Sequence, residues 1–84
     1  MVHMRIVVPS EKAGRTLECL EDFGSVISII HLPHTARRPE GDVILCDVAR
    51  EDASLVIERL KELGVHHDGS IAVELVDTAV SDAA

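Results

Sequence analysis

The two halves of this 84-residue chain repeat one pattern, forty positions apart. The matches preserve the apolar side of a helix, the alternation of the strand before it and the glycine after it. A unit of strand, helix and strand that occurs twice predicts the element order β-α-β-β-α-β. The matched positions are Val8 and Val48, Glu11 and Glu51, Ala13 and Ala53, Leu17 and Ile57, Glu18 and Glu58, Leu20 and Leu60, Phe23 and Leu63, and Gly24 and Gly64.

In the first half, the alternating run VHMRIVVP predicts a strand that stops at Pro9. We expect Ser10 to cap the helix that follows and Gly24 to end it. The next strand is predicted over 26–32, where β-branched residues are frequent. The buried side of the helix is predicted from apolar residues at helical spacing, namely Ala13, Leu17, Leu20 and Phe23.

In the second half, a strand is predicted over 43–48 and a helix from Glu51 or Asp52 to Gly64. The stretch HHDG predicts a turn, and alternating residues predict a last strand over 71–76. The buried side of this helix is predicted to hold Ala53, Val56, Ile57, Leu60 and Leu63.

These elements predict an α+β ferredoxin-like sandwich, with a four-stranded antiparallel sheet and two helices on one face. Right-handed crossovers place both helices on that face, and the first and third strands lie in the centre of the sheet. The domain is expected to cover residues 1–76. The small and polar residues 77–84 are expected to form a flexible tail or linker.

Strand alternation then separates the two faces of the sheet. The side chains expected to face the helices are Met4, Ile6, Val8, Ile44, Cys46 and Val48. Those expected to point away are His3, Arg5, Val7, Val43, Leu45, Asp47, Ala72, Glu74 and Val76. This outer face is mostly apolar, with Arg5 flanked by Asp47 and Glu74, and an open apolar face usually marks an interface. We therefore predict a homo-oligomer that forms through Arg5, Val7, Val43, Leu45, Asp47 and Glu74.

Composition argues against several functional classes. The net charge of −7 opposes binding to nucleic acid or to anionic lipid headgroups. Phe23 is the single aromatic residue, so stacking on RNA bases is also disfavoured. Two cysteines without a signal peptide indicate a reducing, cytoplasmic setting, and no apolar run is long enough to span a bilayer.

The stretch HLPHTARRPEGD, residues 31–42, is predicted to be a loop and holds the candidate ligand-binding residues. His31 and His34 suggest metal binding, but Pro33 separates them and no cysteine is near in sequence. Arg37 and Arg38 suggest a small anionic ligand. The favoured interpretation is a contact loop whose arginines pair with Glu40, Asp42 or a neighbouring subunit; an anion site is the alternative, and no metal or cofactor is expected.

Neither cysteine is a good candidate for a nucleophile. Cys46 is expected to be buried in a strand, where it behaves as a small apolar residue. Cys19 is expected to lie off the apolar side of its helix, near Glu18, Glu21 and Asp22, whose charges would raise the pKa of its thiol. The sequence therefore predicts no catalytic residue.

Three stretches carry a resemblance to a known family: MVHMRIVVPSEKAGRTLECL, HLPHTARRPEGDVILCDVAREDAS and GSIAVELVDTAVSDAA. They resemble the N-terminal region of actinobacterial proteins of the domain-of-unknown-function 389 family, and the run ARRPEGDVILCDVAREDAS is the most specific part. The resemblance implies a soluble domain on the cytoplasmic side of the cell membrane, followed in the parent protein by several hydrophobic helices. It implies no reaction and no catalytic residue.

The sequence thus leads to one expectation and two alternatives. The expectation is a non-enzymatic cytoplasmic domain that assembles or regulates the membrane region of a multi-pass protein. One alternative is a domain that senses a small molecule or anion. The other is a small enzyme or metal-binding domain that uses His31 and His34, with His66 or His67 as a further candidate ligand.

Overall fold

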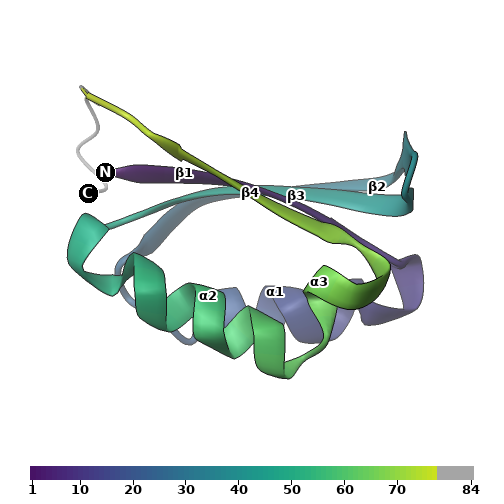
Figure 1. The fold of residues 1–84 in the computed structure, drawn as a ribbon, viewed down its shortest axis with the longest axis horizontal. Coiled ribbons are helices and arrows are strands. Elements are labelled where there is room, and N and C mark those ends of the chain that lie inside the picture. The colour runs from purple at the N-terminus through teal and green to yellow at the C-terminus, as the bar shows by residue number, and fades with distance from the viewer. Residues whose placement is uncertain (78–84) are drawn as a thin grey trace.

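A computed structural model of the chain describes residues 1–77 (Figure 1). The strands are β1 (Val2–Val8), β2 (Val26–Arg37), β3 (Glu40–Val48) and β4 (Ser70–Leu75). The helices are η1 (Ser10–Lys12), α1 (Ala13–Glu21), η2 (Arg50–Asp52), α2 (Ala53–Glu62) and α3 (Val65–Asp68), of which η1 and η2 are 3-10 turns.

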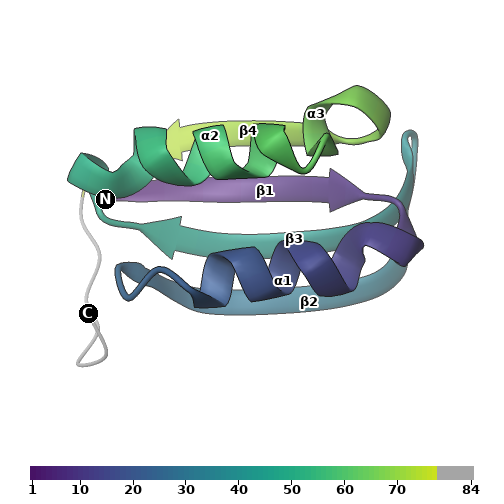
Figure 2. The same ribbon diagram turned by 90° about the horizontal axis from the view of Figure 1, so that it is seen from below.

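The four strands form one sheet in the order β2-β3-β1-β4, and each neighbouring pair is antiparallel. The helices of the described residues all lie on one face of this sheet, and none of the elements within residues 1–77 covers the other face (Figures 1 and 2). The predicted ferredoxin-like fold is confirmed, including the central positions of β1 and β3.

The structure confirms the repeat, because the helical elements of the two halves begin at positions forty residues apart. Turn η1 begins at Ser10 and α1 at Ala13, while η2 begins at Arg50 and α2 at Ala53. The halves diverge after their helices. The first half turns directly into the twelve-residue strand β2, whereas the second inserts α3 before the six-residue strand β4.

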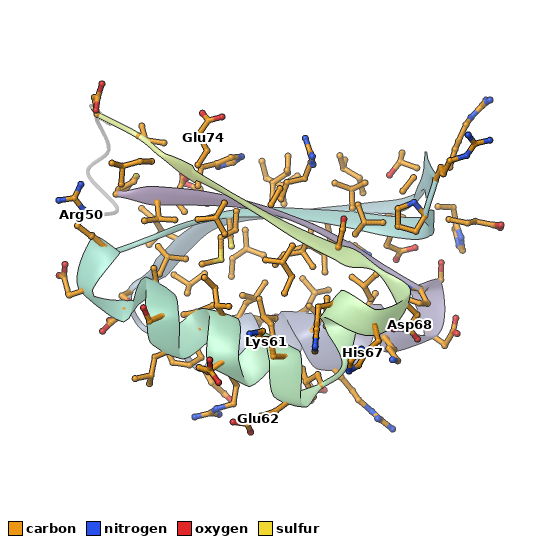
Figure 3. All side chains as sticks on the ribbon, viewed as in Figure 1. Arg50, Lys61, Glu62, His67, Asp68 and Glu74 are labelled. Carbon is orange, nitrogen blue, oxygen red and sulfur yellow. The ribbon has the colours of Figure 1, made fainter. Side chains whose placement is uncertain are left out.

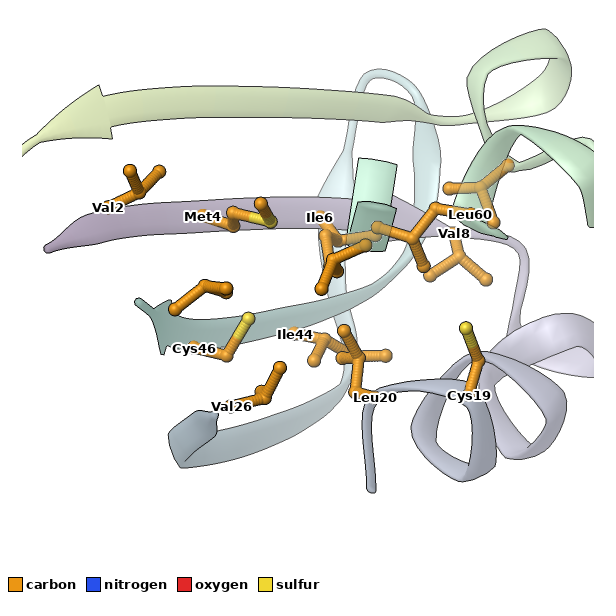
Figure 4. Close-up of a cluster of buried hydrophobic side chains, with 13 residues drawn as sticks. Val2, Met4, Ile6, Val8, Cys19, Leu20, Val26, Ile44, Cys46 and Leu60 are labelled. Atoms are coloured by element: carbon orange, nitrogen blue, oxygen red, sulfur yellow. The ribbon is translucent and has the colours of Figure 1, made fainter. Parts of the chain in front are cut away.

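The core lies between the sheet and the helices (Figure 4). The six strand residues predicted to face the helices are all fully buried there. They pack with Leu20 of α1 and with Val56 and Leu60 of α2, so the core is aliphatic. Cys19 also belongs to this core, and the prediction that it lies off the buried side of its helix was wrong.

The helix ends differ in part from the predictions. Ser10 makes no capping hydrogen bond, because its hydroxyl is used elsewhere, and Pro9 occupies the cap position. Helix α1 ends at Glu21 with Asp22 as its C-cap, so Gly24 is not the cap. Gly64, in contrast, does follow α2 and has a left-handed backbone with φ of 76°.

The largest difference concerns the stretch 31–42, which was predicted as a loop and is mostly strand. Strand β2 continues to Arg37 and β3 starts at Glu40, so only Arg38 and Pro39 form the turn between them. The pairing of β2 with β3 is irregular between Leu32 and Ala36, and this irregularity accommodates Pro33 and polar residues in a strand.

Two further corrections concern the second half. The stretch HHDG forms most of α3 rather than a simple turn, and β4 starts one residue earlier than predicted. Of the predicted tail 77–84, all but Asp77 lies outside the described residues. None of the helices in the described part of the chain has the length and apolar character needed to cross a membrane.

Candidate functional site

A buried carboxylate, that of Asp42, is the centre of the most extensive polar network in the structure. Asp42 is 3% exposed. Its Oδ1 accepts a hydrogen bond from the Ser10 hydroxyl at 2.5 Å and another from the His34 backbone N–H at 3.0 Å. Its Oδ2 accepts one from His31 Nε2 at 2.7 Å. Both carboxylate oxygens are therefore occupied, as a buried charge requires.

The fold explains how these residues meet. Asp42 lies opposite Val8 near the start of β3, on the face that the helices cover. The chain turns there from β1 into η1, which brings the Ser10 hydroxyl to the carboxylate. The irregular part of β2 gives His34 a positive φ of 56°, and its backbone N–H then points at Asp42.

Hydrogen bonding fixes the charge of this carboxyl group. The Ser10 hydroxyl, the His34 backbone N–H and His31, in that order, lower the pKa of Asp42 to about 2, and burial opposes them. Asp42 is thus ionised at neutral pH and holds three segments of chain together.

The hydrogen bonds of the network link segments of the chain to one another. His34 Nδ1 lies 3.1 Å from Ser10 Oγ. Because the hydroxyl gives its single proton to Asp42, the imidazole has to be the donor in this contact. His34 therefore does not act as a base toward Ser10, and the arrangement lacks what activates a serine nucleophile.

A hollow of about 320 Å³ opens beside the network at the end of the β2–β3 hairpin. Its lining residues are Ser10, His34, Ala36, Arg37, Glu40 and Gly41. Gly41 lies so close to the end of β1 that a Cβ at this position would overlap the Val8 carbonyl oxygen. The structure thus brings His34 and Arg37 to one hollow, whereas His31 is bonded to Asp42 and does not line it. Arg38, in the turn, does not line it.

Asp42 was one of three partners expected for the two arginines, beside Glu40 and a neighbouring subunit, and it does not pair with either arginine. The Asp42 oxygens bind Ser10, His34 and His31 instead. Across residues 1–77, neither Arg37 nor Arg38 has a carboxylate within ion-pair distance. Glu40, the strand neighbour of Arg37, also makes no such pair.

The second candidate region is the outer face of the sheet, on the side opposite the helices. Strand register places its residues in three rows: Leu32, Val43, Val7 and Ser70; Ile30, Leu45, Arg5 and Ala72; and Ile27, Asp47, His3 and Glu74. All six predicted interface residues lie in these rows, although Val7 is only 8% exposed. The apolar residues gather over β2 and β3, and Figure 3 shows Glu74 of β4 pointing away from the helices.

The charges of the outer face are arranged differently from the prediction. Arg5 lies opposite Leu45 and Ala72, not between Asp47 and Glu74. His3 occupies that place, and its Nδ1 lies 2.8 Å from Asp47 Oδ1. Arg5 has no ion pair with a described residue.

Histidines and cysteines occur at separate places. His31 and His34 belong to the Asp42 network, His3 to the outer face, and His66 and His67 stack on each other in α3. Within residues 1–77, no group of three or more His, Cys, Asp or Glu side chains could hold a metal ion.

Burial is the main cause that raises the pKa of the Cys19 thiol, and it raises the pKa of the Cys46 thiol to about 11.

Sequence reasoning missed Ser10 and Asp42 as site residues. Ser10 was interpreted as a helix cap, and Asp42 as one of three possible partners of the arginines. The available signal was the alternation of β3, because Asp42 has the same parity as Ile44 and Cys46 and so had to face inward. Comparison with known proteins adds nothing to the site, since no family model and no curated protein matches the chain.

Proposed function

We propose that this chain is a non-enzymatic assembly domain, which forms a symmetric oligomer through the outer face of its sheet. The observation that carries the proposal is the cluster of aliphatic side chains left open on that face. Ile30 is 49% exposed and Leu32 is 39% exposed, next to Val43 and Leu45. Covering such residues with another surface removes apolar area from water, which lowers the free energy of the system.

A second copy of the chain is the partner that fits this face best. In a two-fold arrangement each copy contributes the same surface, so the apolar region over β2 and β3 meets its own counterpart. The face also carries both signs of charge, in Arg5 and in the carboxylates Asp47 and Glu74. Arg5, which has no ion pair with another residue of the range 1–77, then finds a carboxylate on the other copy.

We place this domain on the cytoplasmic side of a membrane, attached to the membrane region of a larger protein. The support is the resemblance of the sequence described above. Attachment to a membrane region raises the effective concentration of the domains. A weak contact between two sheets then suffices to organise the helices to which they are joined.

The test of assembly is sedimentation equilibrium of the 84-residue chain over a concentration series that reaches the millimolar range. We expect a reversible dimer, which Ile30→Glu abolishes because it buries a charge in the interface. Leu55→Glu is the matched control, since Leu55 is 59% exposed but lies on α2, and it should leave the dimer intact. A chain that stays monomeric throughout the series would overturn the proposal.

Attachment to a membrane can be tested by fractionation of cells that express the full reading frame from which this chain comes. We expect the product in the membrane fraction, resistant to extraction by salt and alkali. Recovery in the aqueous fraction would contradict the membrane setting but would leave the assembly proposal standing.

A further inference from the structure

The hollow at the end of the β2–β3 hairpin is lined by charged side chains of both signs. Among its lining residues Arg37 is the permanent cation and Glu40 is the carboxylate. The two are neighbours across the strands, yet no ion pair joins them. Both charges therefore remain available to a ligand.

One wall of the hollow is held in place. Ser10 and His34 line the hollow, and both are bonded to the buried Asp42. Ala36 and Gly41 complete the lining and add little side-chain bulk. A site whose walls are fixed before binding loses less entropy when the ligand enters.

The overall charge of the chain favours one type of ligand over another. A free anion approaches Arg37 against a net charge of −7 and against the nearby Glu40. A zwitterion carries no net charge, and it satisfies Arg37 and Glu40 together. The volume of about 320 Å³ is at the lower end of the range for small-molecule sites, so the ligand is small.

We propose that this hollow binds a small zwitterion of the α-amino acid type. Arg37 holds the carboxylate of the ligand, because guanidinium and carboxylate match in geometry and charge. Glu40 holds the ammonium group, and the Ser10–His34 wall limits the size of the ligand's side chain. This site lies at the tip of the hairpin and does not depend on assembly through the outer face.

The experiment is a titration of the 84-residue chain, followed by the NMR chemical shifts of the Ala36 and Gly41 backbone amides at neutral pH and constant ionic strength. Glycine and L-alanine are the zwitterionic probes. Acetate and phosphate carry only the anionic group, and methylammonium carries only the cationic one. We expect saturable shifts at millimolar glycine or alanine, and at least tenfold weaker binding of the single-charge probes.

Three variants identify the residues responsible. Arg37→Gln and Glu40→Gln should each weaken glycine binding by about tenfold or more, the loss expected for one charge-assisted hydrogen bond. Arg38→Gln is the matched control, because Arg38 is the adjacent arginine and does not line the hollow. It should change the affinity by less than about twofold.

Several outcomes would overturn the proposal. One is phosphate or acetate binding that depends on Arg37 and becomes tighter in Glu40→Gln, which would assign a plain anion site. Another is an equal loss in Arg38→Gln, which would assign non-specific attraction to the hairpin. The third is the absence of any shift with glycine or alanine across the millimolar range.

Discussion

Along β3, two kinds of side chain alternate. Ile44, Cys46 and Val48 face the helices and are fully buried, while Val43, Leu45 and Asp47 face outward and keep part of their surface in solvent. The inner residues are constrained by close packing, because they belong to the buried core between the sheet and the helices. The outer residues are under no such constraint in a single copy. The aliphatic character of Val43 and Leu45 therefore needs another reason, and the proposed assembly would supply one.

The largest expected difference between the faces is between Ile44→Ala and Leu45→Ala, two adjacent residues of one strand. We expect Ile44→Ala to lower the free energy of unfolding by about 2–5 kcal/mol, because it leaves a cavity in the core. Leu45→Ala should cost less than about 1.5 kcal/mol at low protein concentration, because part of its side chain is already in solvent. Denaturant unfolding of both variants measures the difference.

This comparison can be sharpened by raising the protein concentration. If the outer face becomes an interface, the cost of Leu45→Ala should grow with concentration while that of Ile44→Ala should not. Since Ile44→Ala leaves a domain of this size with little stability, Ile44→Val is the milder companion, with an expected loss of about 0.5–1.5 kcal/mol. Equal and concentration-independent losses at both positions would contradict the difference between the faces.

The two carboxylates of β3 extend the comparison to polar residues, since Asp42 lies on the inner face and Asp47 on the outer face, each bonded to a histidine. Asp42→Ala should cost about 2–3 kcal/mol, because it removes the shared acceptor of Ser10, His31 and the His34 backbone N–H. Thermal and denaturant unfolding measure the loss. A cost no greater than that of Asp47→Ala would show that water replaces the carboxylate without penalty.

The inner carboxylate also predicts how stability depends on pH. The folded state lowers the pKa of Asp42 to about 2 from an ordinary value of 3.8. The folded state thus favours the ionised form, and the stabilisation is complete above about pH 4 and is lost as the pH falls toward 2. The shift corresponds to about 2 kcal/mol.

The measurement is the free energy of unfolding of the parent chain and of Asp42→Asn between pH 2 and 6. Other carboxyl groups also titrate in this range, so the difference between the two curves isolates Asp42. We expect the parent to exceed the variant above pH 4 and the two curves to converge near pH 2. Parallel curves would show that the Asp42 carboxyl has the same pKa in the folded and unfolded chain.

The sequence alone predicted the inner face well and the hairpin tip poorly, for a physical reason. Burial of aliphatic residues produces periodic patterns, so the repeat identified both helices, the sheet order and the six buried strand residues. The tip of the hairpin depends on single hydrogen bonds instead. Pro33 and the polar residues around it indicated a loop, whereas the register irregularity in β2 keeps them in a strand.

The polar partners were hard to predict for the same reason. Which carboxylate pairs with which cation on one face depends on rotamers and on offsets of two residues along a strand, and neither changes the alternation between the faces. Asp42 was one of three partners expected for the arginines, but it bonds Ser10 and the two histidines instead. Arg5 was placed between Asp47 and Glu74, the position that His3 occupies.

The smallest expected effect concerns that outer pair, His3 and Asp47, whose side chains both remain partly in solvent. Asp47→Asn should lower the free energy of unfolding by less than about 1 kcal/mol, because solvent weakens the interaction and holding two side chains in place costs entropy. A double-mutant cycle with His3→Gln isolates the pair, and its coupling should shrink as salt is added. A coupling of several kcal/mol that resists salt would mean that the pair is shielded from water. The outer face would then be covered at the concentration of the measurement, and sedimentation of the same samples would identify a second copy of the chain as the cover.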